Sequence, residues 1–250
     1  MMGAEPAFPN FNPLGIEEWL GELAAGFAMT VYLYFVALIG GFVLGLGLAL
    51  ARQYGGRVLS RIATAYIEVI RGTPLLAQLF LIYFVPYSLN AWFTPDGPPL
   101  LDVTWSVRIF GVTVLNHAIF STLLSLGLNS AAYQAEYMRG AMASIGSGQM
   151  LAAQSLGFTK RETLRYIIIP QSFRRMIPSW SNEASYLPKY TVVATFVAVE
   201  DLFGMAKLIV SRTFLALQTY VFVGALYLAL ISVIAKALDV IYERTKIPGL

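Results

Sequence analysis

The chain has 250 residues, of which 57% are hydrophobic and only 12% are charged, and its mean hydropathy is +0.65. Because soluble domains carry roughly 25% charged residues, this composition excludes an ordinary water-soluble protein. The absence of cysteine excludes disulfides, thiolate metal sites and a cysteine nucleophile. The net charge of +3 would indicate a nucleic-acid partner only if the basic residues formed one soluble patch, and here they sort by membrane side instead.

Residues 1–23 are predicted to form an interfacial segment outside the membrane. From residue 14 onward, apolar side chains are mixed with Glu17, Glu18 and Glu22. This amphipathic pattern is expected to lie along the outer interface, with Trp19 at the level of the lipid headgroups. No basic residue precedes the first apolar run, so a cleaved signal peptide is not expected.

Long uncharged stretches predict membrane-spanning helices. Four stretches lack Asp, Glu, Lys and Arg over more than the ~20 residues that a helix needs to cross the hydrocarbon core; they are 24–51, 72–95, 109–135 and 213–235. A fifth apolar stretch carries Lys189, Glu200 and Asp201, so hydropathy alone leaves it ambiguous. The predicted spans are 24–51, 62–91, 109–138, 184–204 and 213–241.

The distribution of charge favours five spans over four. With five spans and the N-terminus outside, 14 of the 17 Lys and Arg residues fall on the inner side and only Arg108, Lys207 and Arg212 outside. Inner loops are enriched in basic residues, whereas four spans would place the acidic N-terminus and the basic C-terminus on one side. We therefore predict an all-α, multi-pass membrane protein, a single domain over 1–250 with its C-terminus in the cytoplasm. The Gly41–Gly45 spacing predicts close packing of another helix.

Residues 139–183, between the third and fourth predicted spans, are expected to form an ordered cytoplasmic insert. The segment is too polar to cross the membrane and longer than the ~12–15 residues of most loops. A short helix is predicted to end at Gly157 as its C-cap. Thr159 and Glu162 have the spacing of a capping box that begins a second helix, which Pro170 is expected to interrupt. This helix–glycine–helix hairpin would form a knob that a soluble partner could grip.

The hairpin also carries a recognisable spacing. Ala152 and Ala153 are followed after three residues by Gly157, and nine further residues lead to Ile167-Ile168-Ile169-Pro170. This spacing resembles the coupling loop of binding-protein-dependent ABC importers, in which Leu151 would be a glutamate. Three other segments resemble the polar amino acid permeases of the histidine, glutamine and arginine type. They are 66–80 (YIEVIRGTPLLAQLF), 130–140 (SAAYQAEYMRG) and 182–191 (NEASYLPKYT).

The resemblance implies a type I ABC importer (MetI-like) permease fold with spans one to three in 24–138, a coupling loop in 139–183 and spans four and five in 184–241. It implies a permease subunit of an ATP-driven importer for a polar amino acid, in the inner or plasma membrane of a prokaryote. Residues expected to couple the chain to the ATPase are Gly148, Leu151, Ala152, Ala153, Gly157 and Pro170. The loss of the glutamate at Leu151 leaves apolar docking, or a second permease that carries the usual residue, as alternatives.

The partners implied are ABC ATPase subunits, a second permease that is identical or homologous, an extracytoplasmic amino-acid-binding protein and membrane lipids. The chain contains no Gly-x-x-x-x-Gly-Lys-Ser/Thr loop. It is therefore not expected to be an enzyme or to hold a cofactor, and ATP and Mg²⁺ are expected on the separate ATPase.

Ionisable residues in or beside the spans indicate either a pathway or a structural pair. Glu68 and Arg71 are three residues apart, as are Glu136 and Arg139, so each pair is expected either to be a local ion pair or to line the path. The carboxylate of Glu183 would suit a basic amino acid as substrate. The resemblance places an aspartate where this chain has Tyr190, which weakens that interpretation. The residues expected along the substrate pathway are Glu183, Tyr186, Lys189, Tyr190, Glu68 and Arg71.

Other classes fit less well. The single histidine, His117, lacks acidic neighbours in its segment, which favours a packing role over a proton relay. A secondary transporter built from inverted repeats needs two equal halves, which five spans cannot supply. A channel would have no use for the hairpin, and a membrane enzyme would need a catalytic cluster that the sequence does not assemble.

Overall fold

The computed structural model describes residues 19–145 and 147–245, so the predicted interfacial segment at 1–23 lies mostly outside the described residues. The longer helices are α1 (Leu20–Tyr54), α2 (Arg57–Gly72), α3 (Leu75–Phe93), α4 (His117–Ala143), α7 (Ile169–Tyr190), α8 (Leu202–Thr213) and α9 (Ala216–Thr245). The shorter elements are α5 (Ser147–Ser155), α6 (Lys160–Thr163), a π turn (Leu164–Ile168), a 3-10 segment (Thr191–Val197) and the strands β1 (Ser106–Ile109) and β2 (Val112–Asn116).

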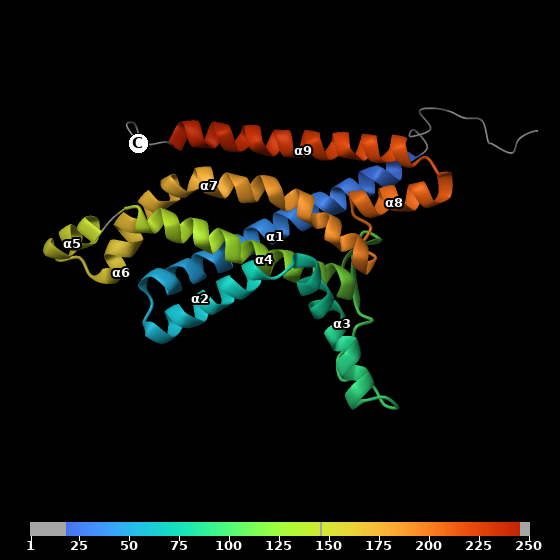
Figure 1. The fold of residues 1–250 in the computed structure, drawn as a ribbon, viewed down its shortest axis with the longest axis horizontal. Coiled ribbons are helices and arrows are strands. Elements are labelled where there is room, and N and C mark those ends of the chain that lie inside the picture. The colour runs from blue at the N-terminus through green and yellow to red at the C-terminus, as the bar shows by residue number, and fades with distance from the viewer. Residues whose placement is uncertain (1–18, 146, 246–250) are drawn as a thin grey trace, which may run out of the picture.

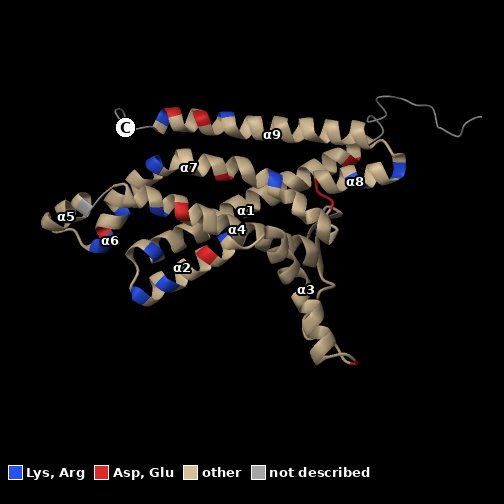
Figure 2. Ribbon diagram, viewed as in Figure 1, with Lys and Arg blue, Asp and Glu red and all other residues tan. Residues whose placement is uncertain are grey.

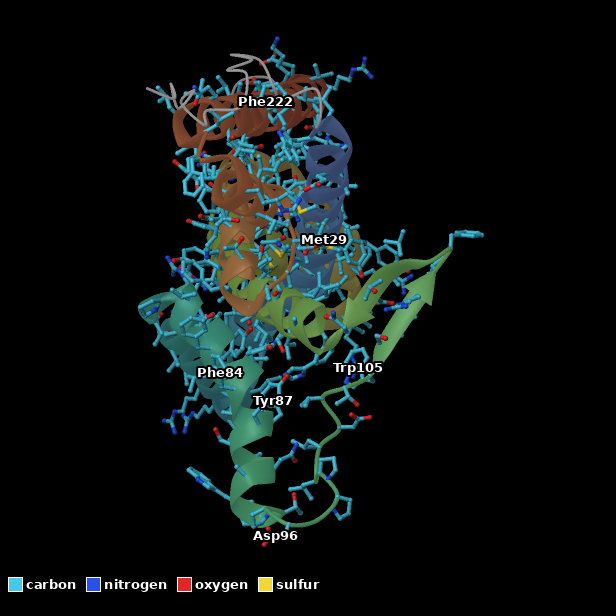
Figure 3. All side chains as sticks on the ribbon, turned by 90° about the vertical axis from the view of Figure 1, so that its right-hand side faces the viewer. Met29, Phe84, Tyr87, Asp96, Trp105 and Phe222 are labelled. Atoms are coloured by element: carbon cyan, nitrogen blue, oxygen red, sulfur yellow. The ribbon has the colours of Figure 1, made fainter. Side chains whose placement is uncertain are left out.

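Helices α1, α4, α7 and α9 run along the long axis of the molecule (Figure 1). The α5–α6 hairpin lies at the same end as the C-terminal end of α9 and the connection between α1 and α2. The start of α1, helix α8 and the connection from α3 to α4 lie at the other end. Helix α3 leaves the bundle at a steep angle. Figure 3 shows Asp96 at the tip of this arm and Trp105 where the polypeptide returns toward the β1–β2 strand pair.

Three of the described helices, α1, α3 and α9, are long and apolar enough to cross a membrane by length and composition alone. Helix α4 is more polar because it lies inside the bundle, packed against α1, α3 and α7. It buries a row of small and amide side chains, namely Ser121, Thr122, Ser125, Asn129, Ser130 and Gln134. Five of these side chains donate hydrogen bonds within the protein, whereas the Ser121 hydroxyl has no hydrogen-bond partner among the described residues.

The glycines of α1 allow α4 to approach closely. A Cβ atom built at Gly41 would lie 2.9 Å from the Gln134 side-chain amide, and one at Gly45 would lie 2.9 Å from the carbonyl oxygen of Ala131. Both distances are shorter than van der Waals contact, so no other residue fits without displacing α4. The predicted close packing at Gly41 and Gly45 is confirmed.

The predicted second span, 62–91, is wrong as a single helix. Thr73 and Pro74 have extended backbones, with ψ of 146° and 132°, and they separate α2 from α3. Proline disfavours helix in the residue before it, and the side-chain amide of Gln78 caps the break by donating to the carbonyl oxygen of Ile70 at 2.7 Å. The chain therefore changes direction within the predicted span.

The predicted third span, 109–138, begins too early. Residues 106–116 form the antiparallel β1–β2 hairpin, whose turn residues Phe110 and Gly111 have φ of 49° and 81°. Two consecutive positive φ values are typical of the tight turn that matches strand twist. Helix α4 begins only at His117, where the Asn116 side chain accepts a hydrogen bond from the amide of Ile119.

The boundary between the predicted insert and the predicted fourth span is also wrong. Helix α7 begins at Ile169 and ends at Tyr190, so its first half lies in the predicted 139–183 insert, and 184–204 is not one helix. The first half of α7 carries Arg174 and Arg175, so its polarity gives no sign that it continues into the apolar second half. Because α7 runs away from the α5–α6 end, Lys189, in its last turn, lies far from the basic residues of the hairpin with which the prediction grouped it.

Asp201 joins the 3-10 segment, α8 and α9 at the end opposite the hairpin. Its buried carboxylate accepts hydrogen bonds from the amide of Gly204 at 2.9 Å, from Thr195 Oγ1 at 3.2 Å and from Tyr227 Oη at 3.3 Å. The preceding Ala198 has a left-handed backbone with φ of 58°. The polypeptide thus turns sharply after the 3-10 segment, and the hydrogen bonds of Asp201 then hold the start of α8 to α9.

Candidate functional site: a polar surface on α4 and α7, and the α5–α6 knob

A buried hydrogen-bonded chain connects α7, α4 and α1. The carboxylate of Glu183, which is 3% exposed, accepts a hydrogen bond from Ser130 Oγ at 2.8 Å. Gln134 Nε2 donates to Ser130 Oγ at 3.0 Å and to the carbonyl oxygen of Leu38 at 3.1 Å, and Gln134 Oε1 accepts from the indole N–H of Trp180 at 2.7 Å. These hydrogen bonds link the Glu183 carboxylate through Ser130 and Gln134 to Trp180 and to the backbone of α1.

Tyrosine side chains surround the approach to Glu183. Tyr186 and Tyr190 project from α7 and are 50% and 39% exposed, and Tyr133 and Tyr137 lie on α4, four residues apart. Tyr190 lies near enough to interact electrostatically with Glu183, Tyr133 and Tyr186. We call these four residues the tyrosine surface.

Two cations lie on the tyrosine surface. The Nζ of Lys189 is 4.4 Å from the centre of the Tyr186 ring, and Cζ of Arg71 is 5.1 Å from the centre of the Tyr133 ring. Lys189 also borders an apolar hollow of about 400 Å³ between α7, α8 and α9. The structure thus brings Glu183, Tyr186, Lys189, Tyr190 and Arg71, which the sequence predicts as pathway residues, to one region.

Glu68 does not join this region. Its carboxylate accepts a hydrogen bond from Arg52 Nη2 at 3.1 Å rather than from Arg71. Glu136 accepts from Arg52 Nη1 at 2.8 Å and pairs with Arg139, as its spacing predicts. Arg52 therefore joins α1 to both α2 and α4 near the α5–α6 end, a connection that spacing within one helix could not indicate.

Other members of the polar region were not recognised from the sequence. They are Ser130, Tyr133, Gln134 and Tyr137, all within the segment SAAYQAEYMRG, whose resemblance to the family does not single out individual residues. Their signal is the four-residue spacing of Ser130 with Gln134 and of Tyr133 with Tyr137, which places each pair on one side of a helix. Trp180 has no comparable signal.

The α5–α6 hairpin has the predicted capping geometry. Gly157 has φ of 91°, and hydrogen bonds from the Phe158 amide to Ala153 O at 3.1 Å and from the Gly157 amide to Gln154 O at 3.0 Å end α5. This double bond pattern is the Schellman motif, which favours glycine. The capping box is present, because Thr159 and Glu162 bond each other's backbone amides. These hydrogen bonds from Thr159 hold the pKa of Glu162 below its usual value.

The predicted coupling residues divide between the surface and the interior of this knob. Leu151 is 62% exposed, and Gly148, Ala152 and Gly157 are also exposed. Ala153 is buried, so it packs the hairpin and does not face a partner. Leu156, which is 80% exposed, is a second exposed apolar side chain of the knob.

Pro170 is exposed at the second position of α7, directly after the π turn. The expected interruption at Pro170 is wrong, because the chain passes from α6 through the π turn into α7 as consecutive helical turns. The knob is therefore continuous with the helix that carries Glu183.

Further contacts join the knob and the first turns of α7 to the rest of the bundle. Lys160 Nζ donates to the carbonyl oxygen of Tyr54 at the end of α1 at 2.8 Å, and Arg175 Nη1 donates to the carbonyl oxygen of Ser144 at the end of α4 at 2.7 Å. Ile168 is buried in the core cluster that contains Ala49. The knob and the start of α7 are thus connected to the ends of α1 and α4.

His117 serves in packing, as its isolated position predicts. Its Nε2 lies 3.0 Å from the carbonyl oxygen of Tyr83, and its ring contacts the rings of Tyr83 and Tyr87. These contacts hold α3 to the start of α4.

The candidate site therefore combines a buried carboxylate, exposed tyrosines and cations on a helix that is continuous with the knob. Residues 41–247 match the model of the family described as the inner membrane component of binding-protein-dependent transport systems, and the chain belongs to this family. It is a permease subunit of a binding-protein-dependent amino acid ABC importer.

Curated relatives agree. The chain is 32% identical over 221 residues to the nopaline transport system permease of Agrobacterium fabrum, covering 88% of this chain and 86% of that protein. It is 34% identical over 227 residues to the octopine transport system permease of Rhizobium meliloti, with 90% and 86% covered. It is 33% identical over 226 residues to the glutamine transport system permease of Escherichia coli, with 90% and 93% covered. These relatives are permease subunits.

Solved structures show the same all-helical fold. An amino acid ABC transporter crystallised with histidines matches with a TM-score of 0.76 and 29% identity, over 97% of this chain and 100% of that one. A chain of the MetNI methionine ABC transporter in an inward-facing conformation matches with a TM-score of 0.71 and 18% identity, over 92% and 99%. The fold is the MetI-like fold of type I importers.

Proposed function

We propose that this chain lines the path of an ATP-driven importer for a polar amino acid and that a separate ATPase drives it through the α5–α6 knob. One observation carries the proposal: α7 is continuous with the knob at one end and bears Glu183, Tyr186, Lys189 and Tyr190 further along. A movement of the knob therefore displaces the polar surface.

The groups on the tyrosine surface suit a zwitterion. Arg71 and Lys189 are donors for an α-carboxylate, since both cations are exposed. Tyrosine ring faces attract an ammonium group by cation–π interaction, worth about 0.5–2 kcal/mol. Glu183 is buried next to this surface, so its negative charge would favour a basic side chain nearby. The relatives named for nopaline, octopine and glutamine support a polar substrate, and the carboxylate favours a basic one.

We propose five crossings: α1, the bent pair α2–α3, α4, α7 and α9. Traced in Figure 1, these elements run alternately toward and away from the α5–α6 end, which supports an odd number of crossings. Figure 2 shows most Lys and Arg residues at that end, which favours a cytoplasmic knob, a cytoplasmic C-terminus and an external N-terminus. The whole chain would form one domain.

The exposed tyrosine surface supports a second permease, identical or homologous, as the opposite wall of the path. One copy leaves Tyr186 and Tyr190 half-exposed, although a path through a bilayer must be enclosed. Two copies related by a two-fold axis would enclose it. An extracytoplasmic binding protein would deliver the substrate to the end that carries α8.

ATP and Mg²⁺ would bind the partner ATPase. For ATP to select between two conformations of the permease, the ATPase must bind the knob differently in each of them. Leu151 and Leu156 offer it an apolar contact in place of the family glutamate. Lys160 and Arg175 would pass the resulting force to α1 and α4.

The test is uptake of a panel of labelled amino acids by proteoliposomes that contain the permease, its ATPase and its binding protein. We expect ATP-dependent uptake of polar amino acids, which Lys189→Ala and Arg71→Ala reduce at least tenfold. Lys207→Ala and Arg57→Ala, which remove cations away from the tyrosine surface, are matched controls. Equal losses in all four variants, or uptake without ATP, would refute the proposed path.

A further inference from the structure

The glycines of α1 fall into two groups. Gly41 and Gly45 face α4, as described above, whereas a Cβ atom built at Gly40 or Gly47 would meet no atom within 4 Å. Gly40 and Gly47 are seven residues apart, so they share one side of the helix. This side does not pack on the bundle, and its glycines need another explanation.

An open groove runs along this side between α1 and α2. Gly40, Val43 and Gly47 of α1, with Leu59 and Ile62 of α2, line a hollow of about 720 Å³ whose surface is almost entirely apolar. It continues into a second hollow of about 420 Å³, because the two share Gly47, Ala51 and Leu59. The two hollows therefore form one continuous apolar groove that is open to the surface along its length.

Two arginines stand at the knob end of the groove. Arg161 and Arg165 line the second hollow together with Tyr54 and Leu164. Both arginines are exposed, and within the described part of the chain neither forms a salt bridge. Arg165 lies over the ring of Tyr166, with 5.6 Å between Cζ and the ring centre. The nearby Glu162 is committed to Thr159. The mouth thus has two free positive charges.

We propose that this groove binds one anionic phospholipid of the inner leaflet, with an acyl chain along Gly40 and Gly47 and the phosphate between Arg161 and Arg165. The proposal uses the orientation proposed above, with the knob in the cytoplasm. Basic pockets beside membrane helices on the cytoplasmic side are typical sites for acidic headgroups.

The length of the groove matches one leaflet. From Gly40 to Ala51 a helix rises about 16 Å at ~1.5 Å per residue, and half of a hydrocarbon core of ~30 Å is about 15 Å. If the phosphate of a phospholipid lies between Arg161 and Arg165, the acyl chain of that lipid would end near Gly40. An apolar groove of this length with cations at one end only is complementary to a phospholipid.

The position of the groove argues against a second permease as its occupant. Leu59 and Ile62 lie on the side of α2 opposite Arg57, Arg61 and Glu68, as helical spacing requires. Arg71, near those charged residues, faces the tyrosine surface on which we propose that the second permease packs. The groove is left for lipid.

The experiment is native mass spectrometry of the full-length permease, delipidated and titrated with phosphatidylglycerol or phosphatidylcholine of identical acyl chains. We expect phosphatidylglycerol to bind at least fivefold more tightly. The double variant Arg161→Gln/Arg165→Gln should bind both lipids alike, and Gly47→Leu, which fills open space, should weaken both. Arg57→Gln/Arg61→Gln removes the same charge from the other side of α2, and Gly21→Leu adds the same side chain where α1 is also open.

Equal binding of the two lipids by the wild type, or an equal loss in the Arg57→Gln/Arg61→Gln control, would overturn the proposal in favour of general surface charge. Dissociation of a permease dimer by Gly47→Leu, with lipid binding unchanged, would overturn it in favour of a second copy. Because the readout is bound lipid, it does not depend on which substrate is transported or on whether uptake is measured.

Discussion

Ser130 donates a hydrogen bond of 2.8 Å to the buried carboxylate of Glu183 and thereby joins the middle of α4 to α7. Burying a charge without partners is costly. The Ser130 hydroxyl, which itself accepts from the Gln134 amide, therefore stabilises the buried carboxylate of Glu183 when α4 and α7 are packed together.

Ser130→Ala removes the hydrogen-bond donor of Glu183, and we expect it to lower the free energy of unfolding by about 1–3 kcal/mol, as for a buried polar group left without a partner. Thermal unfolding in detergent measures this change. Ser155→Ala is the matched control, since the Ser155 hydroxyl bonds Leu151 O on the exposed knob. Equal melting temperatures for the two variants would mean that the contact contributes no stability.

Glu183→Gln keeps an acceptor for Ser130 but removes the negative charge. We expect the folded complex to assemble normally and the preference for basic over neutral amino acids to fall about tenfold, equivalent to ~1.4 kcal/mol. Competition uptake assays measure this preference. Glu200→Gln, an exposed carboxylate in the loop before α8, is the control. An unchanged preference would remove Glu183 from the substrate path.

Leu151→Arg places a charge on the apolar surface of the knob, which we expect to abolish co-purification of the ATPase while the permease still inserts into the membrane. Gln149→Arg, on the other side of α5, should retain the ATPase. Ala153 is a poor test position because its side chain is buried and an arginine there would unfold the hairpin. Normal ATPase retention by Leu151→Arg would disprove docking at this surface.

The capping box should make the start of α6 sensitive to acid. Hydrogen bonds from the backbone and side chain of Thr159 lower the pKa of Glu162 in the folded state. Its contribution is therefore complete above the usual glutamate pKa and is lost as the pH falls through the lower, folded value. Amide hydrogen exchange of 159–163, corrected for intrinsic rates, should quicken below that value. Glu162→Gln, which preserves the cap, should flatten the profile.

Gly45→Val should separate α1 from α4, because its Cβ atom would lie 2.9 Å from Ala131 O. Overpacking of this kind costs about 1–3 kcal/mol, and thermal unfolding in detergent would report it. Gly21→Val adds the same side chain where nothing lies within 4 Å. A Gly45 variant as stable as the Gly21 variant would show that the helices adjust without cost.

The sequence was most informative where a local rule applies. Gly157, Thr159 and Glu162 form a cap over a few residues, and a cap depends only on neighbours in the chain, so its geometry was predictable. The same holds for the pairing of Glu136 with Arg139. The family resemblance then placed the hairpin within a permease.

The errors occurred where polarity is hidden by packing. The predicted insert 139–183 is too polar in sequence to cross a membrane, yet it contains the first half of α7, and its last residue, Glu183, is buried against Ser130, 53 residues away. Likewise Arg52 pairs with Glu68 and Glu136 on two other helices. Contacts between distant segments leave no periodic signal in either one.

The left-handed turn at Ala198 and the fastening of Asp201 to Gly204, Thr195 and Tyr227 have a mechanical consequence. The hydrogen bonds of Asp201 hold α8 to α9, whereas the turn at Ala198 interrupts the backbone between α7 and α8. Helix α7 can therefore change its angle relative to α8 and α9, which move together. Spin labels at Tyr186 and Lys207 should therefore change separation between nucleotide states, while labels at Lys207 and Tyr220 keep theirs.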